Sequence, residues 1–356
     1  MSRPGLFHGL LRLGLSALQV ALSAWDDSYG TIFERTHSMT TITRRLALAL
    51  LAALSTAAFA QDGKPVRILT NWFAQPDQAG YWQAQEDQLG KDAGLKITVL
   101  QGGPKIQTIP QVASGQAEFG IGNADDVLLA RLRGAPVKAV FAHLDYVPYA
   151  FVYHRDPAVK GIADLQGRSF AVNIGSAYWE WTKKQYKLAS VRELPVSGDL
   201  SLFRNDPKMV QQGYSLYLPA RMAEAGIAVQ QISVASLGYR PYNVLFTTDE
   251  MIQKNPALVK ATIAAVQKGW SNYVRNPGGL KPLLTGMNQQ ISPAIYDAAS
   301  KDMIENLLSH DLGRIGCMQD ARWKELAGQL RSVGFLPASF DEKQAYERGL
   351  VTGCAP

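Results

Sequence analysis

Alternation of β-branched apolar runs with helical segments constrains the fold of this chain more than any other feature. The predicted strands cover residues 66–71, 95–100, 117–122 and 135–142. The predicted helices between them cover 78–91, a short segment that ends near Val112, and a segment capped by Asn123 whose apolar face is Val127, Leu128 and Leu132. Because strands joined through helices form right-handed crossovers, the sequence predicts a parallel sheet in an α/β fold.

A second α/β unit begins where the chain runs extended over 148–156. A polar turn at 164–168 leads into a strand, a helix follows at 177–189, and 211–226 is typical of a strand end followed by a helix. The chain returns through 242–250 and continues in helices predicted at 256–275, 291–309 and 319–333. We therefore expect a first lobe formed by 61–147 and 236–356, and a second lobe formed by 148–235.

The segment at 39–60 has the three parts of a secretory signal peptide. Arg44 and Arg45 are followed by a short apolar run and by the sequence Ala58-Phe59-Ala60, which predicts cleavage after Ala60. No cysteine lies near this site, so a lipid anchor is not expected. The twin arginines match a folded-export signal only weakly, which favours the general secretory route. Residues 1–38 precede the signal, and we interpret Met39 as the start of translation.

Charge and cysteine content limit the class of protein. Residues 1–60 hold five arginines and three acidic residues, so the rest of the chain has 31 basic and 27 acidic residues, a net charge of about +4. These charges are scattered, and no basic cluster with interleaved aromatic residues predicts nucleic-acid binding. Cys317 and Cys354 are the two cysteines. An oxidising compartment allows them to pair; two buried thiols are the alternative.

Unusual polar and aromatic residues follow the predicted strands, where α/β folds bind ligands. The stretch NWFAQPDQAGYW (71–82) follows the first strand, GGP (102–104) the second, Asn123 the third, and IGSAYWEW (174–181) the first strand of the second lobe. Each stretch also has a structural interpretation, as core aromatics, a turn before a helix, or helix caps. The polar residues beside Trp72 and Phe73 would be costly to bury unpaired, which favours a ligand-lining loop there.

Catalytic patterns are scarce. The histidines after residue 60 are His143, His154 and His310, and their spacing does not match a metal site. The chain has neither a G-x-S-x-G motif nor a phosphate-binding G-x-x-x-x-G-K-[ST] motif. Asp125 and Asp126 are an acidic pair, but adjacent residues on a helix point apart. The sequence therefore predicts no enzyme activity, no cofactor and no metal site.

The order of these stretches resembles the NMT1/THI5-like family, a branch of the nitrate/taurine-type periplasmic binding proteins of ABC importers. The resemblance covers most of 65–275, and its motifs are NWFAQPDQAGYW, DAGLKITVLQGGP (92–104), SGQAEFGIGNADDVLLARLRGAPVKAV (114–140), GIADLQGRSFAVN (161–173) and QQGYSLYLP (211–219). It implies a type II periplasmic binding fold, with two lobes that two crossing strands join and that close on a small molecule. It also implies a monomer in the periplasm that delivers a thiamine pyrimidine precursor to an importer permease.

The chain departs from the family at positions that affect the ligand. Relatives that bind pyrimidine precursors often have histidine and glycine where this chain has Gln78 and Ala79, and glutamate where it has Leu218. A planar, less polar or anionic ligand therefore stays open: a flavin, an aromatic carboxylate, or an aliphatic sulfonate such as taurine. An exported pyrimidine-synthase-like enzyme is the alternative of another class. Its relatives carry lysine and histidine where Gly122 and Asp126 stand, and a cysteine-rich run near 238–246, which disfavours that chemistry here.

These considerations give a specific hypothesis for the site. Trp72 and its neighbours form one side, Tyr178 or Trp179 forms the other, and a flat ring lies between them. Asn71, Gln78, Asn123 and Ser176 fix the polar edge of the ring. The complete set of candidate ligand-binding residues is Asn71, Trp72, Phe73, Gln78, Tyr81, Gly103, Asn123, Tyr149, Ser176, Tyr178, Trp179, Tyr214 and Leu218.

Overall fold

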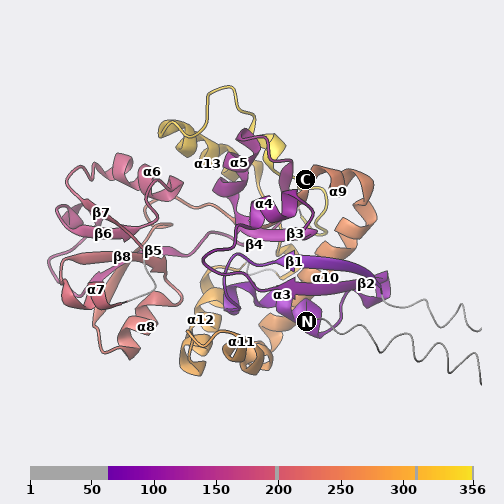
Figure 1. Cartoon of the computed structure of the whole chain (residues 1–356), viewed down its shortest axis with the longest axis horizontal. Helices are drawn as coiled ribbons and strands as arrows, with labels where there is room; N and C mark the ends of the chain where they lie inside the picture. Colours follow the sequence, from indigo (N-terminus) through magenta and orange to yellow (C-terminus); the bar gives the residue numbers. More distant parts are fainter. Residues whose placement is uncertain (1–62, 197–199, 309–311, 355–356) are drawn as a thin grey trace, which may run out of the picture. The chain divides into compact units, whose positions relative to one another are not determined.

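Two five-stranded sheets organise the computed structural model, which describes residues 63–196, 200–308 and 312–354 (Figure 1). The first sheet has the order β2-β1-β3-β10-β4 and the second the order β7-β6-β8-β5-β9. The strands of the first sheet are β1 (Lys64–Leu69), β2 (Leu95–Leu100), β3 (Phe119–Asn123), β4 (Val137–Leu144) and β10 (Asn243–Thr248). The strands of the second are β5 (Tyr149–His154), β6 (Ser169–Val172), β7 (Arg192–Pro195), β8 (Met209–Tyr214) and β9 (Val229–Ser233). The predicted signal peptide, its cleavage site and residues 1–38 lie outside the described residues.

We call the part of the chain around each sheet the first and the second lobe. The chain passes between the sheets twice, over 145–148, the first connection, and over 234–242, the second connection. The predicted lobe boundaries at 147/148 and 235/236 fall within these connections. We keep them as a prediction of where one lobe ends and the other begins. These two connections lie where the sequence predicts a two-strand hinge, but neither of them is a strand.

Both sheets are mixed rather than purely parallel. Strand β1 pairs in parallel with β2 and β3, as the alternation of strands and helices predicts. Strand β10 separates β3 from β4 and runs antiparallel to both, because the chain re-enters the first sheet from the edge that faces the second. In the second sheet, β5 likewise runs antiparallel to β8 and β9, whereas β6 pairs in parallel with β7 and β8.

Helices cover both faces of the first sheet (Figure 1). Helices α3 (Ala79–Glu86) and α10 (Pro256–Arg275) belong to one core, and α5 (Ala124–Leu132) and α13 (Asp320–Ser332) to the other. Strand β10 contributes to both, with Leu245 in the first core and Val244 and Phe246 in the second, as the alternation of side chains along a strand requires. The buried face of α10 repeats at helical spacing, which explains why the prediction of 256–275 is confirmed at both ends.

The remaining helices complete the two lobes. They are α4 (Thr108–Ala113), α6 (Ala177–Tyr186), α7 (Ser201–Asn205), α8 (Leu218–Glu224), α9 (Asp249–Lys254), α11 (Lys281–Met287) and α12 (Pro293–Asn306). Short 3-10 helices cover Pro76–Gln78, Lys91–Ala93, Ile162–Leu165, Pro277–Leu280, Leu312–Arg314 and Glu342–Ala345. The predicted helices at 291–309 and 319–333 are confirmed with shorter ends.

The predicted helix over 78–91 is too long at its C-terminal end. Helix α3 ends at Glu86, and Gln88 adopts a left-handed conformation with φ of 51°. The amide of Leu89 donates to the carbonyl of Ala84, and the amide of Gln88 donates to that of Gln85, both at 3.0 Å. These two bonds form a Schellman motif, which closes the helix although no glycine stands at the left-handed position.

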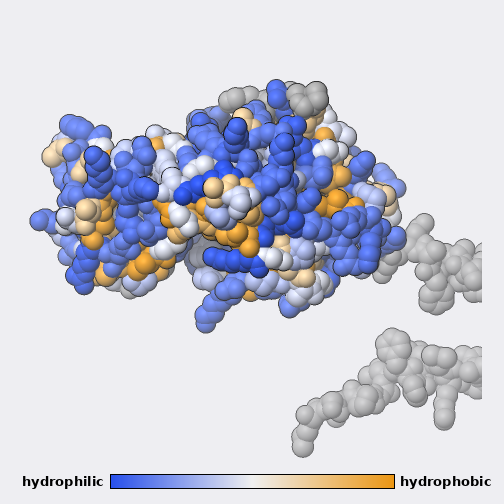
Figure 2. Space-filling view, turned by 90° about the horizontal axis from the view of Figure 1, so that it is seen from above, coloured by the Kyte–Doolittle hydropathy of each residue, from blue (hydrophilic) through white to orange (hydrophobic). Residues whose placement is uncertain are grey.

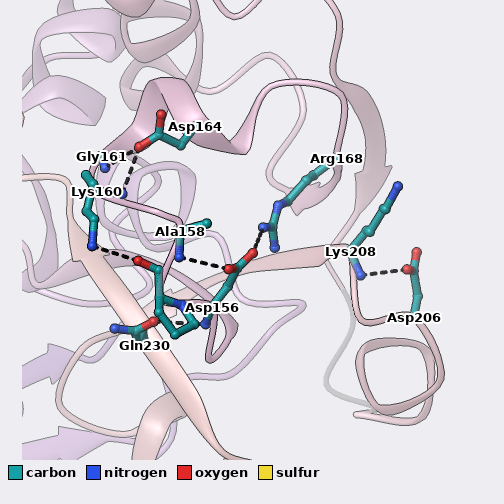
Figure 3. A network of polar contacts seen from close by, with 10 residues as sticks. Asp156, Ala158, Lys160, Gly161, Asp164, Arg168, Asp206, Lys208 and Gln230 are labelled. Carbon is teal, nitrogen blue, oxygen red and sulfur yellow. Dashed lines mark hydrogen bonds and ion pairs between the residues drawn. The ribbon is translucent and has the colours of Figure 1, made fainter.

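A polar network fixes the turn that precedes β6 in the second lobe (Figure 3). The carboxylate of Asp156 accepts from the amide of Ala158 at 3.0 Å and forms an ion pair with Arg168 at 2.5 Å. One oxygen of Asp164 accepts from the amide of Gly161 at 3.0 Å. In this turn, carboxylate side chains thus accept the hydrogen bonds of backbone N–H groups that are not paired within a sheet.

Few large apolar side chains are strongly exposed among the described residues. On the face shown in Figure 2, hydrophilic residues surround small hydrophobic patches. The exposed large apolar residues are Trp72, Ile106, Leu132, Ile174, Leu202 and Met287. Among the described residues, no helix combines the length and the apolar character needed to cross a bilayer.

Candidate functional site

The loops that carry the candidate residues meet because of the strand directions. Strands β1, β2 and β3 end at the edge of the first sheet where β10 begins, since Asn243 pairs with Asn123. In the second sheet β6 and β8 end where β5 begins, since Tyr149 pairs with Tyr214. Both connections leave and enter the sheets at these two edges. The polar loops of one lobe therefore come within contact distance of those of the other.

Direct hydrogen bonds join the lobes at these edges. The hydroxyl of Tyr217 donates to Oδ1 of Asp77 at 2.6 Å and accepts from the Asp77 amide at 3.1 Å. The side-chain Nδ2 of Asn123 donates to the hydroxyl of Tyr149 at 3.0 Å. We call the connected set of side chains at this junction the inter-lobe cluster. It consists of Asn71, Asp77, Gln78, Asn123, Asp126, Tyr149, Tyr178, Tyr214 and Tyr217.

Asn123 occupies the N-cap position of α5 but does not cap the helix with its side chain, so the predicted capping role is wrong. Its Nδ2 donates to Asp126 Oδ2 and to Tyr149, both at 3.0 Å. Its Oδ1 accepts from Asn243 Nδ2 at 2.7 Å. Cross-strand pairing with β10 directs this amide away from the helix amides, and the sequence around Asn123 contains no signal for that pairing.

Tyrosines form the aromatic part of the cluster in the second lobe. Tyr149 stacks on Tyr178 with ring centroids 4.6 Å apart, and Tyr214 meets Tyr149 edge-on at 5.5 Å. Tyr178 is buried, whereas Tyr149 and Tyr214 are half-buried. Burial raises the pKa of Tyr214 well above its ordinary value, and the charges of Asp77 and Asp126 raise that pKa further. This hydroxyl therefore stays protonated beside the carboxyl groups.

Two aspartates of the cluster, Asp77 and Asp126, and the adjacent Asp125 determine its electrostatic character. Burial raises the pKa of Asp77 to about 6, although the hydrogen bond from Tyr217 opposes this. Asp126 is exposed to solvent, but the protein around it and the neighbouring Asp125 raise its pKa to about 7. Asp125 is buried and accepts from the Tyr239 hydroxyl at 2.8 Å. Among the ion pairs of the described residues, none includes these three carboxyl groups.

The loop after β1 holds an exposed aromatic residue and a buried amide. Trp72 is 39% exposed and meets Phe73 edge-on at 5.6 Å. Gly103 leaves room for Phe73, because a Cβ there would lie 3.2 Å from the ring. Gln78 is fully buried; its Nε2 donates to Asn71 Oδ1 at 3.2 Å, and its Oε1 has no hydrogen-bond partner among the described residues.

Three of the predicted site residues lie in the core instead. Trp179 is fully buried, 4.9 Å from Phe170 between ring centroids, so it cannot form one side of a ring sandwich with Trp72. Tyr81 is fully buried and pairs with His143 Nδ1 at 2.8 Å. Leu218 is buried in the core of the second lobe. We leave these three out of the proposed site, because packing within one lobe already occupies them.

Ser176 holds the N-cap position of α6 but makes no capping bond. It is half-buried, and its Oγ has no hydrogen-bond partner among the described residues. The cap predicted for this position is therefore absent in this structure. The Ser176 Oγ is itself buried, so this hydroxyl is an unpaired polar group inside the described structure.

Sequence reasoning missed Asp77, Asp126 and Tyr217 as site residues. The two adjacent aspartates do point apart, since Asp125 contacts Tyr239 and Asp126 contacts Asn123. Asp126 nevertheless lies at the junction between the lobes. Tyr217 follows Tyr214 by three residues. A second tyrosine so close to a candidate site residue was the signal in the sequence that could have identified it. Its pairing with Asp77 joins positions 140 residues apart, which no local pattern reveals.

Metal-ligating groups do not gather in this part of the chain. Within 63–196, 200–308 and 312–354, no three His, Cys, Asp or Glu side chains come together as metal ligands would. Burial lowers the pKa of His143 to about 3, so this imidazole is neutral. His154 stacks on Phe203 at 4.3 Å, and His310 lies outside the described residues.

The sequence of this chain matches a known protein family. Residues 75–279 match the family described as NMT1/THI5 like. The riboflavin-binding protein RibY of Chloroflexus aurantiacus is 23% identical over 288 residues, which cover 77% of this chain and 80% of that protein. The 4-amino-5-hydroxymethyl-2-methylpyrimidine phosphate synthase of Aspergillus parasiticus is 22% identical over 301 residues, 77% of this chain and 84% of the synthase.

A solved structure supports the same fold. The periplasmic aliphatic sulphonate binding protein SsuA of Escherichia coli superposes with a TM-score of 0.65 at 14% identity, over 83% of this chain and 96% of SsuA. Because the identity is low, this likeness supports the fold alone. The chain therefore belongs to the NMT1/THI5-like family and has the type II periplasmic binding protein fold.

Proposed function

We propose that this protein is a periplasmic solute receptor, active as a monomer, that delivers a small planar heteroaromatic compound to the permease of an ABC importer. The observation that carries the proposal is the inter-lobe cluster, in which both lobes contribute aromatic and hydrogen-bonding side chains to one junction. Trp72 is exposed beside the cluster and offers a further ring. Each aromatic contact with a flat ligand contributes about 0.5–1.5 kcal/mol beyond burial.

The charge of the cluster narrows the ligand class. Asp77 and Asp126 accept hydrogen bonds but have no cationic partner in the ion pairs of the described residues. Carboxyl groups in such surroundings favour a ligand with N–H donors or a positive charge and repel anions. This argument favours an aminopyrimidine such as a thiamine precursor over sulfonates, taurine and aromatic carboxylates. Asp126 would supply the acidic group that relatives carry at the position of Leu218.

A flavin is the second candidate ligand. Its ring system is planar and carries an N–H donor, which matches tyrosine rings beside carboxyl and amide groups. The riboflavin-binding relative supports this candidate, at 23% identity over most of both chains. The two candidates differ in ring size, so a direct competition between them distinguishes a pyrimidine-sized site from a larger one.

We propose binding without turnover, although one relative is a synthase. The synthases of the family carry lysine and histidine where this chain has Gly122 and Asp126. A Cβ at Gly122 would lie 3.2 Å from the Phe246 ring, so this position is tight for any larger side chain. Incubation of the purified protein with a bound candidate, followed by mass analysis, is expected to return the compound unchanged; a product would favour the enzyme alternative.

A thermal-shift screen of the purified protein tests the proposed ligand class. The panel contains aminopyrimidines, riboflavin, aromatic carboxylates, taurine and an alkanesulfonate. A compound that binds only the folded state raises the melting midpoint by mass action. We expect shifts with aminopyrimidines or riboflavin and none with the anions. Shifts with sulfonates alone would overturn the ligand class while leaving the receptor proposal in place.

Substitution of Trp72 tests the position of the site. Trp72→Ala is expected to weaken binding of the identified ligand about tenfold, which corresponds to about 1.4 kcal/mol, without a change in unfolding midpoint. Leu132→Ala removes another exposed apolar side chain, on α5, and is the control. Unchanged affinity in the Trp72 variant would contradict the placement of the ligand beside this residue.

A further inference from the structure

Arg322 on α13 contacts both connections between the lobes. Its Nη2 donates to the carbonyl of Arg240 in the second connection at 2.7 Å and to the carbonyl of Asp145 in the first. Its guanidinium lies over the Tyr242 ring, 3.9 Å from the centroid. An ion pair with the Asp145 carboxylate at 3.8 Å adds a weaker contact. One side chain therefore joins the two segments through which the lobes are linked.

The two connections are also paired with each other at this point. The amide of Val147 donates to the carbonyl of Pro241 at 2.9 Å. The amide of Gln319, directly before α13, donates to the Tyr242 hydroxyl at 3.2 Å. The guanidinium thus lies where the first connection, the second connection and the N-terminal end of α13 meet.

Helix α13 reaches the second lobe at its other end as well. Gln329 donates to the carbonyl of Gly238 in the second connection at 2.8 Å, and Lys184 of α6 donates to the carbonyl of Ser332. The helix packs on α5 of the first lobe through its buried face. It therefore runs alongside the hinge with contacts on both sides of it.

We propose that Arg322 is a positioning residue for lobe movement: it couples the two connections into one hinge and holds the lobes in contact. A guanidinium suits this role because it is permanently charged and donates in several fixed directions while its flat face stacks on an aromatic ring. Because one guanidinium donates charge-assisted hydrogen bonds to both carbonyls, a displacement of one connection shifts the other. This inference goes beyond the proposed function, since it concerns lobe movement without ligand.

A purely structural role, in which Arg322 only anchors α13, predicts a different result. Arg331 on the same helix is the matched control, because it contacts the Phe340 carbonyl at 2.7 Å and Glu342 at 2.7 Å and no residue of the connections. Loss of either arginine weakens the anchoring of α13. Loss of Arg322 alone is expected to change how the lobes sit relative to each other.

Small-angle scattering and amide exchange of the ligand-free protein, expressed from the full sequence, test the proposal. We expect Arg322→Gln to have a larger radius of gyration than wild type and Arg331→Gln to match wild type. Exchange of the Val147 amide is expected to be about tenfold faster in Arg322→Gln, while the Ile68 amide in β1 is unchanged. An unchanged radius of gyration, or the same rise in both variants, would overturn the proposal.

A conservative variant keeps the test decisive if Arg322→Gln does not fold. Arg322→Lys keeps the charge but lacks the planar fork that reaches both carbonyls while lying on Tyr242. We expect the radius of gyration to rise and Val147 exchange to accelerate in this variant also. Wild-type values of both quantities in folded Arg322→Lys would show that the fork geometry does not couple the connections. Neither measurement uses a ligand, so failure here leaves the proposed function untouched.

Discussion

At the scale of single residues, Asp77 links the stability of the protein to pH. This carboxyl is buried and pairs with Tyr217 of the other lobe at 2.6 Å. Burial raises its pKa to about 6, above the value near 4 of an unfolded chain. Between these values the folded state binds more protons than the unfolded state, so this group stabilises the protein less as pH rises through about 6.

The variant Asp77→Asn tests this linkage. The amide keeps an acceptor for Tyr217 but carries no charge, so the variant is expected to gain stability relative to wild type as pH rises from 4 to 7.5. The pKa difference corresponds to about 3 kcal/mol as an order of magnitude. Urea unfolding at several pH values measures it, with Asp92→Asn at an exposed site as control. Parallel stability profiles for wild type and Asp77→Asn would contradict the prediction.

Asp126 is expected to make ligand binding depend on pH. Its pKa is raised to about 7 by the surrounding protein and by Asp125, while Asn123 and Arg133 act in the opposite direction. The carboxyl therefore ionises as pH rises from 6 to 8. A ring ligand that donates an N–H group to this carboxyl is expected to bind more tightly at pH 8, where the carboxylate is the stronger acceptor.

Calorimetric titration at pH 6 and pH 8 measures this dependence. Asp126→Asn cannot ionise at this position, so its affinity is expected to vary much less with pH. Wild type and variant with equal pH dependence would remove Asp126 from the ligand contacts. This prediction depends on the ligand class proposed above, whereas the prediction for Asp77 does not.

At the scale of elements, the packing of α3 on α10 depends on the absence of side chains. A Cβ at Gly80 would lie 2.2 Å from the Trp270 ring, which is itself fully buried. Gly269 makes the same close approach from α10, where a Cβ would lie 2.2 Å from the Gly80 carbonyl oxygen. Two glycines therefore let the helix backbones come together, so the pair acts as one packing unit.

Gly80→Ala is expected to destabilise the protein by about 1–3 kcal/mol, because the core cannot shift to accept the methyl group. Gly328→Ala is the matched control: this glycine is on an exposed turn of α13, and nothing lies within 4 Å of an added Cβ. That change is expected to stabilise by about 0.5–1 kcal/mol through helix propensity. Urea unfolding midpoints give both signs, and equal effects would refute the packing argument.

At the scale of the whole molecule, a disulfide fastens the C-terminal segment to the first lobe. Cys317 and Cys354 are bonded, which is one of the two alternatives that the sequence left open. Gln267 of α10 holds the same region, since its Nε2 donates to the carbonyl of Gly313 at 3.0 Å and to that of Thr352 at 3.4 Å. The crosslink therefore closes a segment of 37 positions that contains α13.

Replacement of both cysteines by serine is expected to cost about 3–4 kcal/mol of stability, mainly because the unfolded chain loses a constraint across 37 positions. Urea unfolding of the double variant measures this, and wild type with a reductant is the comparison. The C-terminal segment is expected to become sensitive to limited proteolysis before the rest of the chain. Equal stability with and without the bond would show that Gln267 and the core contacts hold the segment alone.

The sequence by itself determined the local elements and the family. Strand 95–100 and helix 256–275 lie where their periodicities predict them, because burial of one face imposes a period of 2 or 3.6 on any such element. The order of motifs along the chain predicted the two-lobed fold. The local elements depend on neighbouring residues, and the family depends on the order of motifs along the sequence.

The tertiary structure alone decided which residues form the junction between the lobes. Insertion of β10 beside β3 turned the Asn123 amide from a helix cap into a link to Asn243 and Tyr149. Packing against Phe170 placed Trp179 in the core, while Tyr217 reached Asp77 across 140 positions. The physical reason is that the partner of a polar or aromatic side chain depends on long-range pairing, and a pattern of neighbouring residues contains no information about it.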